Sequence, residues 1–471
     1  MTALSEKKRI VVVGAGIAGL STAYMLRVSG RERSIETEIT ILESNDRHGG
    51  ATRTDISDGY LCEWGPNGFL DNEPATLNLV ERLNLNSELV PANENSARRF
   101  IYHSGKMRQL PSNPPAFLMS DILPLFSKLR IACELMIPAK RNGTEETVAA
   151  FSRRRLGKNF TKYMLDPMIS GIFAGNIEKL ALESIFPKIV EMETTYGGLF
   201  KALLAKKRKA KRSYTTTGGP AGPNATLHTF RKGMGQLTDS LAGKFEGNIK
   251  LSSTVDGINR LPDGWEVMTA DQSIIADAVV LACPSHAAAG IIADFSPEVS
   301  KTIGGIYHAP VSVVCHGYEV NNVADRLNGF GVLIPRSEGI RSLGTLWSDS
   351  IFPGQAPQGQ QLMRTIIGGA HDPEIEHVSD GDLTSIVVVD HHRVTGVSER
   401  PSYIRMFRHP KGIAQYNIGH LTRVKACEDF EKQHLGLYFT GASYRGVSVN
   451  GCVKDACRIA KSFWEREKGA I

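Results

Sequence analysis

The stretch RIVVVGAGIAGLSTAYMLRVSG, residues 9–30, decides the fold of this chain. It opens with a β-branched run too uniformly apolar for a strand with one wet face, and it continues through three glycines into a helical pattern that ends at Gly30. A GxGxxG pattern between a strand and a helix is typical of dinucleotide-binding proteins. Gly14 permits the turn, Gly16 lets backbone approach a pyrophosphate, and Gly19 allows close helix packing. The helix N-terminus adds a partial positive charge.

A second strand is expected in TEITILES, residues 37–44. Together the two strands predict the start of a parallel, doubly wound sheet with a right-handed crossover, that is, a Rossmann-like domain. Glu43 ends the second strand, where a carboxylate can accept both ribose hydroxyls of an adenosine. The same charge would repel the 2′-phosphate of an NADP-type cofactor.

The residues that follow distinguish between dinucleotides. SNDRHGGATRT places Arg47 where it can pair a phosphate, and Gly49 and Gly50 where backbone can pass close to a ribityl chain and a flavin. EWGPNGF, residues 63–69, adds a second approach lined by backbone. These features favour FAD over a dissociable nicotinamide cofactor.

A third glycine-rich turn, TGASYRGVSVNGC, lies at residues 440–452, near the other end of the chain. FAD is long, so a second backbone-lined turn must cover its flavin end. Gly441 and Ala442 remove bulk there, and a helix that starts near Val449 would aim its N-terminal dipole at the flavin.

The chain between these motifs predicts two further parts. From about Ser112, prolines at segment starts and apolar residues at helical spacing indicate a helical insert, with RLG as a break inside one helix pair. Alternating strands from Val311 to Ile367 indicate an antiparallel sheet. The predicted protein is α/β, with a FAD-binding domain (1–95, 240–300 and 430–471), a substrate-binding domain (96–112, 213–239 and 301–429) and a helical membrane-associated domain (113–212).

Between Thr194 and Thr238 the chain has no acidic residue but nine lysines or arginines, six of them in KKRKAKR, residues 206–212. Next to the apolar GGLFKALL, this run predicts contact with anionic lipid head groups. A solvated loop is the alternative. Nucleic-acid binding is not expected, because no recognition module accompanies the run.

Composition sets the remaining expectations. With 471 residues, 41% hydrophobic and 22% charged, the chain is a typical globular protein. Its seven cysteines form no CxxC pair, so we expect a reducing compartment and no metal site. Only nine residues precede the first strand and no apolar window reaches 18 residues, so we expect a cytoplasmic protein without a spanning helix.

Taken as a whole, the chain resembles the oxygen-dependent protoporphyrinogen oxidase family, within the superfamily of FAD-dependent amine oxidases and phytoene desaturases. Beyond the superfamily motifs, the resemblance extends over the full length in RRFIYHSGKMRQLP (98–111), SGIFAGN (170–176), GFGVLIP (329–335), AQYNIGH (414–420) and GASYRGVSVN (441–450).

The resemblance implies six-electron oxidation of a porphyrinogen to a porphyrin of haem biosynthesis, with dioxygen becoming hydrogen peroxide and no catalytic side chain. It also implies a peripheral membrane location, product transfer to a ferrochelatase and a homodimer. The implied substrate contacts are Arg99 to a propionate, the Gly171 carbonyl to pyrrole N–H groups, Leu333 and Ile366 around the macrocycle, and Asn67 near flavin and ring. Arg98 is expected to face solvent instead. The expected FAD contacts are Gly14, Gly16, Ile17, Ala18, Gly19, Glu43, Ser44, Arg47, Gly49, Gly50, Gly65, Pro66, Asn67, Gly68, Val255, Gly441, Ala442, Val447, Ser448 and Val449.

Some features depart from the family pattern. Gly451 stands where an acid is common, and His48 replaces an aliphatic residue and is expected to be an ordinary loop histidine. Protoporphyrinogen IX is the expected substrate. Coproporphyrinogen III and an amine substrate are alternatives, and an anionic partner for Arg99 argues against a carotenoid. A fold of this kind without flavin could serve as a binding protein, but intact Arg47, Gly49 and Gly50 favour a flavoenzyme.

Overall fold

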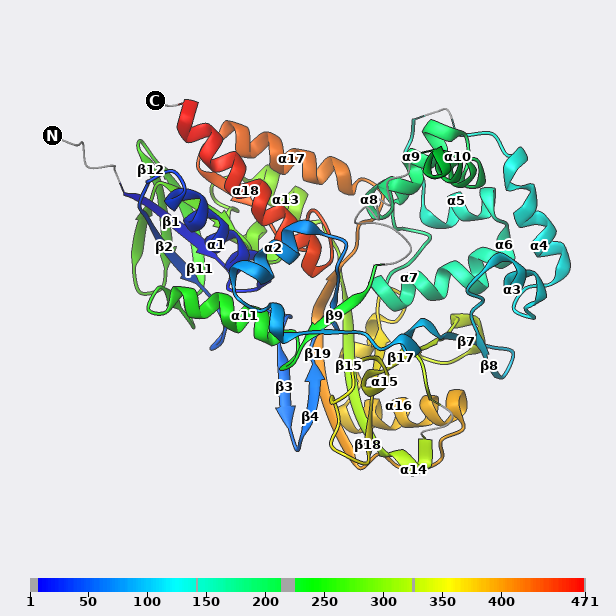
Figure 1. Ribbon diagram of the computed structural model, residues 1–471. Coiled ribbons are helices and arrows are strands. Elements are labelled where there is room, and N and C mark those ends of the chain that lie inside the picture. Colours follow the sequence, from blue (N-terminus) through cyan, green and yellow to red (C-terminus); the bar gives the residue numbers. More distant parts are fainter. Residues whose placement is uncertain (1–6, 141–142, 213–224, 324–326, 470–471) are drawn as a thin grey trace.

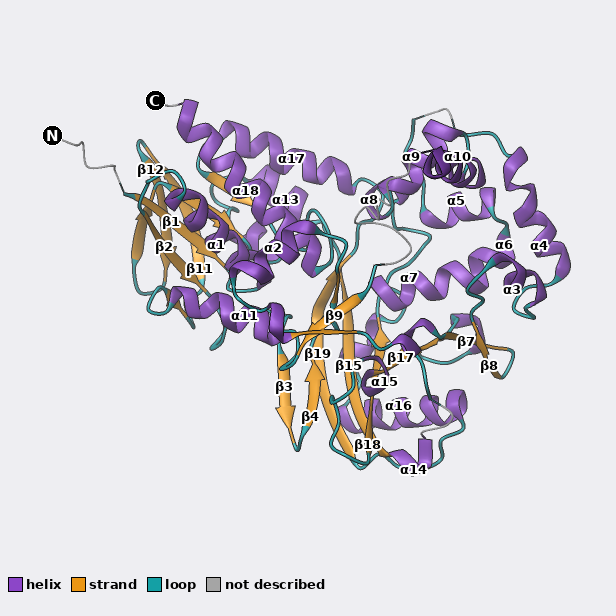
Figure 2. Ribbon diagram, viewed as in Figure 1, coloured by secondary structure: helices purple, strands orange, loops and turns teal. Residues whose placement is uncertain are grey.

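The computed structural model describes residues 7–140, 143–212, 225–323 and 327–469. Figure 1 shows three parts: a part that carries both termini, a part built on a large sheet, and a helical part. Figure 2 shows helices packed around strands in the first part, mainly strands in the second part and helices in the third. Among the described residues, no helix is both long enough and apolar enough to cross a bilayer.

The first part is built on a parallel five-stranded sheet in the order β10-β2-β1-β14-β20. The central strand β1 (Lys8–Val13) is buried along its apolar run, because α-helices and a second, antiparallel sheet cover its two faces. The expected helix is α1 (Ile17–Arg31), one residue longer than predicted. Its partner strands are β2 (Thr37–Leu42), β10 (Ile249–Lys250), β14 (Ala278–Leu281) and β20 (Leu437–Phe439).

The two ends of the chain meet in this part. α1 packs along the last helix, α18 (Val449–Gly469), whose start agrees with the prediction. A Cβ on Gly30 would lie 2.9 Å from the Trp464 ring, and the Trp464 indole N–H donates to the Leu26 carbonyl at 3.2 Å. The contact is therefore close enough to require a glycine.

Further elements complete the first part. Residues 225–239, expected in the substrate-binding domain, contribute Phe230, Met234 and Leu237 to the core around α1 and α18. The elements are α2 (Pro74–Arg82), β5 (Phe69–Leu70), β6 (Leu89–Pro91), β9 (Leu227–Phe230), α11 (Gly235–Ala242), β11 (Val255–Leu261), β12 (Gly264–Thr269), β13 (Ser273–Ala276), α12 (Ser285–Ile291), α13 (Pro297–Gly304) and α17 (His420–Gln433).

The second part contains a seven-stranded sheet in the order β19-β15-β18-β17-β16-β7-β8. It is antiparallel except where β16 runs parallel to β7. The helix α16 (Asp380–Thr395) packs Leu383 and Val387 on one face, against Val314 and Ile367. The strands are β7 (Arg99–His103), β8 (Lys106–Gln109), β15 (His308–Glu319), β16 (Gly331–Leu333), β17 (Ser342–Trp347), β18 (Gln360–Gly368) and β19 (Tyr403–Ala414).

A hairpin connects the first two parts. Its strands β3 (Thr54–Ser57) and β4 (Tyr60–Glu63) leave the cofactor loop and pack Tyr60 and Cys62 against Val313 and Phe407 of the large sheet. The hairpin therefore carries the 63–69 turn to the boundary between the two parts.

The third part is helical, as expected. The predicted break lies at Gly157, which has φ of +92°, and a π-helical turn at Thr161–Leu165 precedes α7. The basic run 206–212 forms the end of α10 rather than a loop, and TTTGGPAGPN after it lies outside the described residues. The helices are α3 (Pro114–Met119), α4 (Leu125–Ala132), α5 (Val148–Arg155), α6 (Lys158–Phe160), α7 (Asp166–Phe173), α8 (Leu182–Ile185), α9 (Pro187–Tyr196) and α10 (Leu199–Arg212).

Candidate functional site

The turn between β1 and α1 is as tight as its glycines predict. Gly14 has φ of +106°, and its N–H donates to the Leu42 carbonyl at 2.7 Å. A Cβ on Gly19 would lie only 1.9 Å from the Gly14 carbonyl oxygen. Gly16 precedes α1 without any side-chain cap, and no acid lies in the first turn of the helix. The N–H groups there are therefore available to an anion.

Glu43 is held beside this turn and is 5% exposed. Its Oε2 accepts the Ala15 N–H at 2.8 Å, and its Oε1 accepts the Asn45 N–H at 3.0 Å. The next segment, Leu251–Val255, returns to the same place, since the Ser253 N–H donates to the Glu43 carbonyl at 2.8 Å. The Ser44 hydroxyl donates to Glu43 Oε1 at 3.4 Å, and Val255 lies in the same hydrophobic cluster as Val13 and Leu42, the residues that end the two strands.

The loop after Glu43 lies against the β1–α1 turn. The Gly49 N–H donates to the Ala15 carbonyl at 2.8 Å, and Gly49 pairs with Gly16 in an isolated bridge. A Cβ on Gly50 would lie 3.1 Å from the Gly16 Cα. Arg47 is exposed at the start of this loop. His48 lies 2.9 Å from Asp239, as expected of an ordinary loop histidine.

The 63–69 turn packs directly on this loop. A Cβ on Gly65 would lie 2.4 Å from the Ala51 carbonyl oxygen, and one on Gly68 would lie 2.6 Å from the His228 carbonyl oxygen. Asn67, one residue after Pro66, has both amide atoms buried without a hydrogen-bond partner. A buried amide without partners is costly and indicates a missing polar ligand.

The C-terminal turn meets the N-terminal one. Gly441, with φ of +114°, would place a Cβ 3.6 Å from the Ala18 Cβ, next to Ile17 of the same helix turn. The Ala442 carbonyl accepts the Tyr416 hydroxyl at 2.8 Å. Ser448 caps α18 by accepting the Gly451 N–H at 3.0 Å, between Val447 and Val449. A turn at each end of the chain therefore borders one site.

Two histidines support the C-terminal turn. His308 Nε2 lies 3.0 Å from the Ser443 hydroxyl, and His420 Nε2 lies 2.9 Å from the Tyr444 carbonyl. Burial lowers the pKa of each imidazole to about 4. Both are therefore neutral at physiological pH and hold the turn in place.

The residues expected to contact substrate lie on one face of the large sheet. Leu333, Gly344 and Ile366 are direct partners across β16, β17 and β18. A Cβ on Gly171 of α7 would lie 2.5 Å from Leu333 Cδ2. The structure thus brings Gly171, Leu333 and Ile366 together around Gly344 of β17, which has no side chain.

Arg99 lies on β7, where it pairs with Gly331, two residues before Leu333. Because side chains alternate along a strand, Arg99 shares the face of Leu333. Its guanidinium carbon lies 5.0 Å from the Phe330 ring centroid. The expected exposures are reversed, since Arg99 is exposed and Arg98 is half-buried. Successive side chains along a strand point to opposite faces, so the two arginines differ in exposure. The Arg98 carbonyl accepts the Phe330 N–H at 2.8 Å.

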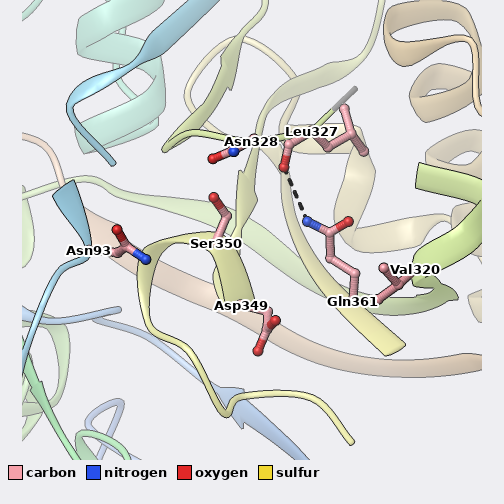
Figure 3. Close-up of a pocket in the computed structure, with 7 residues that line it drawn as sticks. All are labelled: Asn93, Val320, Leu327, Asn328, Asp349, Ser350 and Gln361. Carbon is pink, nitrogen blue, oxygen red and sulfur yellow. Dashed lines mark hydrogen bonds between the residues drawn. The ribbon is translucent and has the colours of Figure 1, made fainter. Parts of the chain in front are cut away.

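A pocket of about 210 Å³ lies elsewhere, beside α14 (Val320–Val323) and α15 (Ser348–Ile351) (Figure 3). It contains none of the predicted site residues. Cofactor and drug-sized ligand sites usually exceed ~300 Å³, so this pocket is too small for a dinucleotide or a tetrapyrrole. Its lining residues are Asn93, Val320, Leu327, Asn328, Asp349, Ser350 and Gln361.

The site also contains charged residues that no pattern in the sequence indicated. Glu63 on β4 is 1% exposed, and burial raises its pKa to about 7. Its Oε1 accepts the Met234 N–H at 2.7 Å, and its Oε2 accepts the Thr54 hydroxyl at 2.8 Å. Arg364 on β18 is also buried beside the 63–65 backbone. Both residues belong to ordinary strands, so only the tertiary structure reveals them.

The raised pKa of Glu63 gives a testable dependence of stability on pH. The unfolded carboxyl ionises near pH 4.5 and the folded one near 7, so raising the pH across this range favours the unfolded state. Glu63→Gln has no titrating carboxyl at this position. We therefore expect its free energy of unfolding to rise by about 3 kcal/mol relative to that of the parent between pH 4.5 and 7. Urea unfolding at several pH values measures the difference, and a gap independent of pH would contradict the expectation. Arg364, Cys62 and Cys315 also surround the carboxyl and are unchanged in both proteins.

The glycine turn between β1 and α1, the buried Glu43 and the C-terminal turn beside Ala18 are together typical of a flavoprotein of the amine oxidase type. The family described as flavin containing amine oxidoreductase matches residues 17–462, and the chain belongs to this family. It is 30% identical to the chloroplastic protoporphyrinogen oxidase of Nicotiana tabacum, over 96% of this chain and 84% of that one. It is 28% identical to the coproporphyrinogen III oxidase of Bacillus subtilis (strain 168), over 95% and 96%.

Solved structures agree on the fold. A protein from Exiguobacterium sp. 255-15 superposes with a TM-score of 0.82 at 24% identity, covering 97% of this chain and 98% of that one. A redesigned single-substitution variant of putrescine oxidase superposes with a TM-score of 0.73 at 15% identity, covering 98% and 99%. The fold prediction of an α/β protein with a parallel and an antiparallel sheet is confirmed, and so is the cofactor, FAD.

The residues present fit this cofactor. A Cβ on Gly16 would meet only the Gly50 Cα, at 3.8 Å, α1 begins without a side-chain cap, and the Asn67 amide lacks partners. Residues 14–19 and Glu43 would hold the adenosine and pyrophosphate end, and residues 65–68 and 441–449 the flavin end.

Proposed function

We propose that this FAD-dependent oxidoreductase oxidises protoporphyrinogen IX to protoporphyrin IX in haem biosynthesis, with dioxygen as the final acceptor. The observation that carries the proposal is the contact of Gly171 with Leu333, beside the bare strand position of Gly344. A tetrapyrrole macrocycle with apolar faces and inward N–H groups needs apolar side chains and backbone carbonyls close together, and this arrangement supplies both. The names of the Nicotiana and Bacillus relatives support a porphyrinogen substrate.

FAD, when bound, supplies the oxidising capacity, two electrons at a time. The protein's own task is to bind and orient the ring. The Gly171 carbonyl would accept pyrrole N–H groups, Leu333 and Ile366 would pack against the ring, and Arg99 would pair with a propionate. Asn67 has two unpartnered amide atoms available for flavin or substrate. The proposed reaction assigns no step to a side-chain acid or base.

Coproporphyrinogen III is the second candidate, because the Bacillus relative that carries its name aligns over 96% of its own length. The decisive experiment gives the purified enzyme both porphyrinogens in competition, prepared anaerobically, and follows porphyrin fluorescence after air is admitted. Preference for protoporphyrinogen IX supports the proposal. Preference for the tetracarboxylate would identify coproporphyrinogen III as the substrate instead. Oxidation of neither porphyrinogen would overturn the proposed function.

Arg99→Ala tests the propionate contact. Loss of a charge-assisted hydrogen bond should raise KM by about 10- to 100-fold and leave FAD bound. Initial rates across substrate concentration, with a flavin spectrum of each protein, measure this. Arg98→Ala is the matched control and should change KM less. Equal effects of the two substitutions would remove Arg99 from the site.

We also propose that the protein is cytoplasmic and that its helical part attaches it to a membrane surface. Met119, Phe126 and Met136 are 89%, 85% and 75% exposed, on α3, α4 and the turn after α4. Leu203 and Leu204 are half exposed on α10, and the basic run follows them on the same helix. Apolar side chains together with nearby cations form the two signals that stable surface binding needs.

The two signals can be separated by salt. Phe126→Ser with Met119→Ser should weaken sedimentation with anionic vesicles about equally at ~0.1 and ~0.5 M salt. The combined substitutions Lys206→Glu, Lys207→Glu and Arg208→Glu should weaken sedimentation mainly at low salt, where charges are less screened. Val389→Ser, at a 64% exposed residue of α16, is the control. Undiminished sedimentation of both variants would exclude this surface. Transfer of product to a ferrochelatase and homodimerisation remain predictions.

A further inference from the structure

Two arginines adjoin residues 63–65 from different elements. Arg364 is 3% exposed, and its guanidinium donates to the Glu63 carbonyl at 3.2 Å and to the Gly65 carbonyl. Arg53 is half-buried, its Nε is buried without a hydrogen-bond partner, and its guanidinium carbon lies 5.0 Å from the Trp64 ring centroid. Within the described ranges, neither guanidinium lies in a salt bridge with a carboxylate.

Trp64 connects the two arginines. Its N–H donates to the Arg53 carbonyl at 3.0 Å, and its carbonyl lies 3.0 Å from His409 Nε2. Its ring stacks on Phe407 of the large sheet at 4.8 Å. The pKa of His409 is lowered by burial and by the charges of Arg364 and Arg53, so this imidazole is neutral. Both cations therefore act on the same short backbone segment.

The acids nearby compensate these cations only in part. The Glu63 carboxyl is engaged by the Met234 N–H and the Thr54 hydroxyl, and it makes no direct contact with Arg364. The loop acids Glu43 and Asp46 act on Arg53, but Arg47 opposes them with its own charge. Burial lowers the pKa of both Arg53 and Arg364, in accord with guanidinium groups that are shielded from water and lack a carboxylate in direct contact. Desolvated cations of this kind stabilise an anion placed beside them.

The segment that they support is where the flavin end of FAD is expected. Gly65 packs on the Ala51 carbonyl, and the Asn67 amide is unpartnered two residues further on. We propose that Arg364 and Arg53 act as positioning residues that stabilise the negative charge which reduction places on the flavin, and thereby raise its reduction potential. The proposal rests on FAD binding at this site and does not depend on the identity of the substrate.

The test measures the reduction potential of the flavin in the purified holoenzyme, by equilibration with a redox dye. Arg364→Gln and Arg53→Gln should each lower the potential by about 30 mV or more, which corresponds to a tenfold change for a two-electron couple. Sulfite, a small anion that adds to oxidised flavin, should bind each variant at least tenfold more weakly. Arg364→Lys keeps the charge but loses the paired donors of the guanidinium. Its affinity for sulfite should therefore stay within a factor of about three of that of the parent.

Arg405→Gln is the matched control. Arg405 lies 6.0 Å from the Phe407 ring centroid in the same aromatic cluster, but it is exposed and pairs with Asp55. The control should leave the potential and sulfite binding unchanged. If Arg364→Gln does not fold, the proposal is tested with Arg53→Gln, because Arg53 is only half-buried.

The outcomes separate clearly. An unchanged potential in variants that still bind flavin overturns the proposal. A lowered potential in Arg364→Lys as well as Arg364→Gln also overturns it, because hydrogen-bond geometry and not charge would then be responsible. Loss of flavin from both glutamine variants overturns it too, since the arginines would then hold the cofactor instead of tuning it. Failure of the parent enzyme to oxidise porphyrinogens would reject the proposed function only. The flavin reduction potentials could still be measured, so the role of the two arginines would be tested separately.

Discussion

Replacing Gly19 with alanine is expected to give a folded protein that purifies colourless. The added Cβ would lie 1.9 Å from the Gly14 carbonyl oxygen, so the helix must move away from the turn that receives the pyrophosphate. Relieving such an overlap costs about 3 kcal/mol, which corresponds to about 100-fold weaker FAD binding. Titration of the apoprotein with FAD, followed by flavin fluorescence, measures the loss.

Gly290→Ala is the control for this experiment. Gly290 lies in α12, and a Cβ there would meet nothing within 4 Å. This variant should bind FAD as tightly as the parent. If Gly19→Ala kept a full complement of flavin, the β1–α1 turn would not be the pyrophosphate site.

The second large effect is expected at Arg155, which is fully buried in the helical part. Its Nε lies 3.4 Å from Glu134 and 3.3 Å from Glu193, and its terminal nitrogens donate to the Ile137 and Gly197 carbonyls at 2.6 and 2.8 Å. Arg155→Met leaves a buried carboxylate without its cation, and it should destabilise the protein by about 3–5 kcal/mol. The midpoint of urea unfolding, followed by circular dichroism, measures the change.

Glu134 gives this prediction a specific structural consequence. Its carboxylate accepts the Leu199 and Phe200 N–H groups at 2.8 and 3.1 Å and so caps α10. Faster hydrogen exchange in α10 should therefore accompany the loss of stability. The control, Arg153→Met, removes an exposed ion pair with Glu178 and should cost less than about 1 kcal/mol. If Arg153→Met and Arg155→Met lowered the free energy of unfolding by similar amounts, the buried ion pairs of Arg155 would not have the stabilising role assigned to them.

The cofactor turns could be read from the sequence because their geometry restricts residue type locally. Gly14 and Gly441 have positive φ, and Gly19 is in a position that no Cβ can occupy. Such constraints leave glycines at fixed spacing between strand and helix patterns. The start of α18 at Val449 was predictable for the same reason.

Residues whose position depends on distant segments were not predictable in this way. Arg364 and Arg53 lie on ordinary strand and loop patterns, and their relation to Trp64 arises only when β18 meets the hairpin. The exposures of Arg98 and Arg99 depend on how β7 packs beside β16, more than two hundred residues away. Leu333 and Ile366 were placed by resemblance alone, because one apolar strand residue looks like another in the sequence.

The contact between α1 and α18 has a consequence for how the enzyme matures. The adenosine-binding turn is translated early and the turn beside Ala18 much later, so a growing polypeptide on the ribosome lacks one wall of the compartment. Loading of the prosthetic group must then wait until that later turn has been made. A nonsense mutation just before Gly441 would remove this turn together with α18, and the product could not retain its flavin although every early motif is intact.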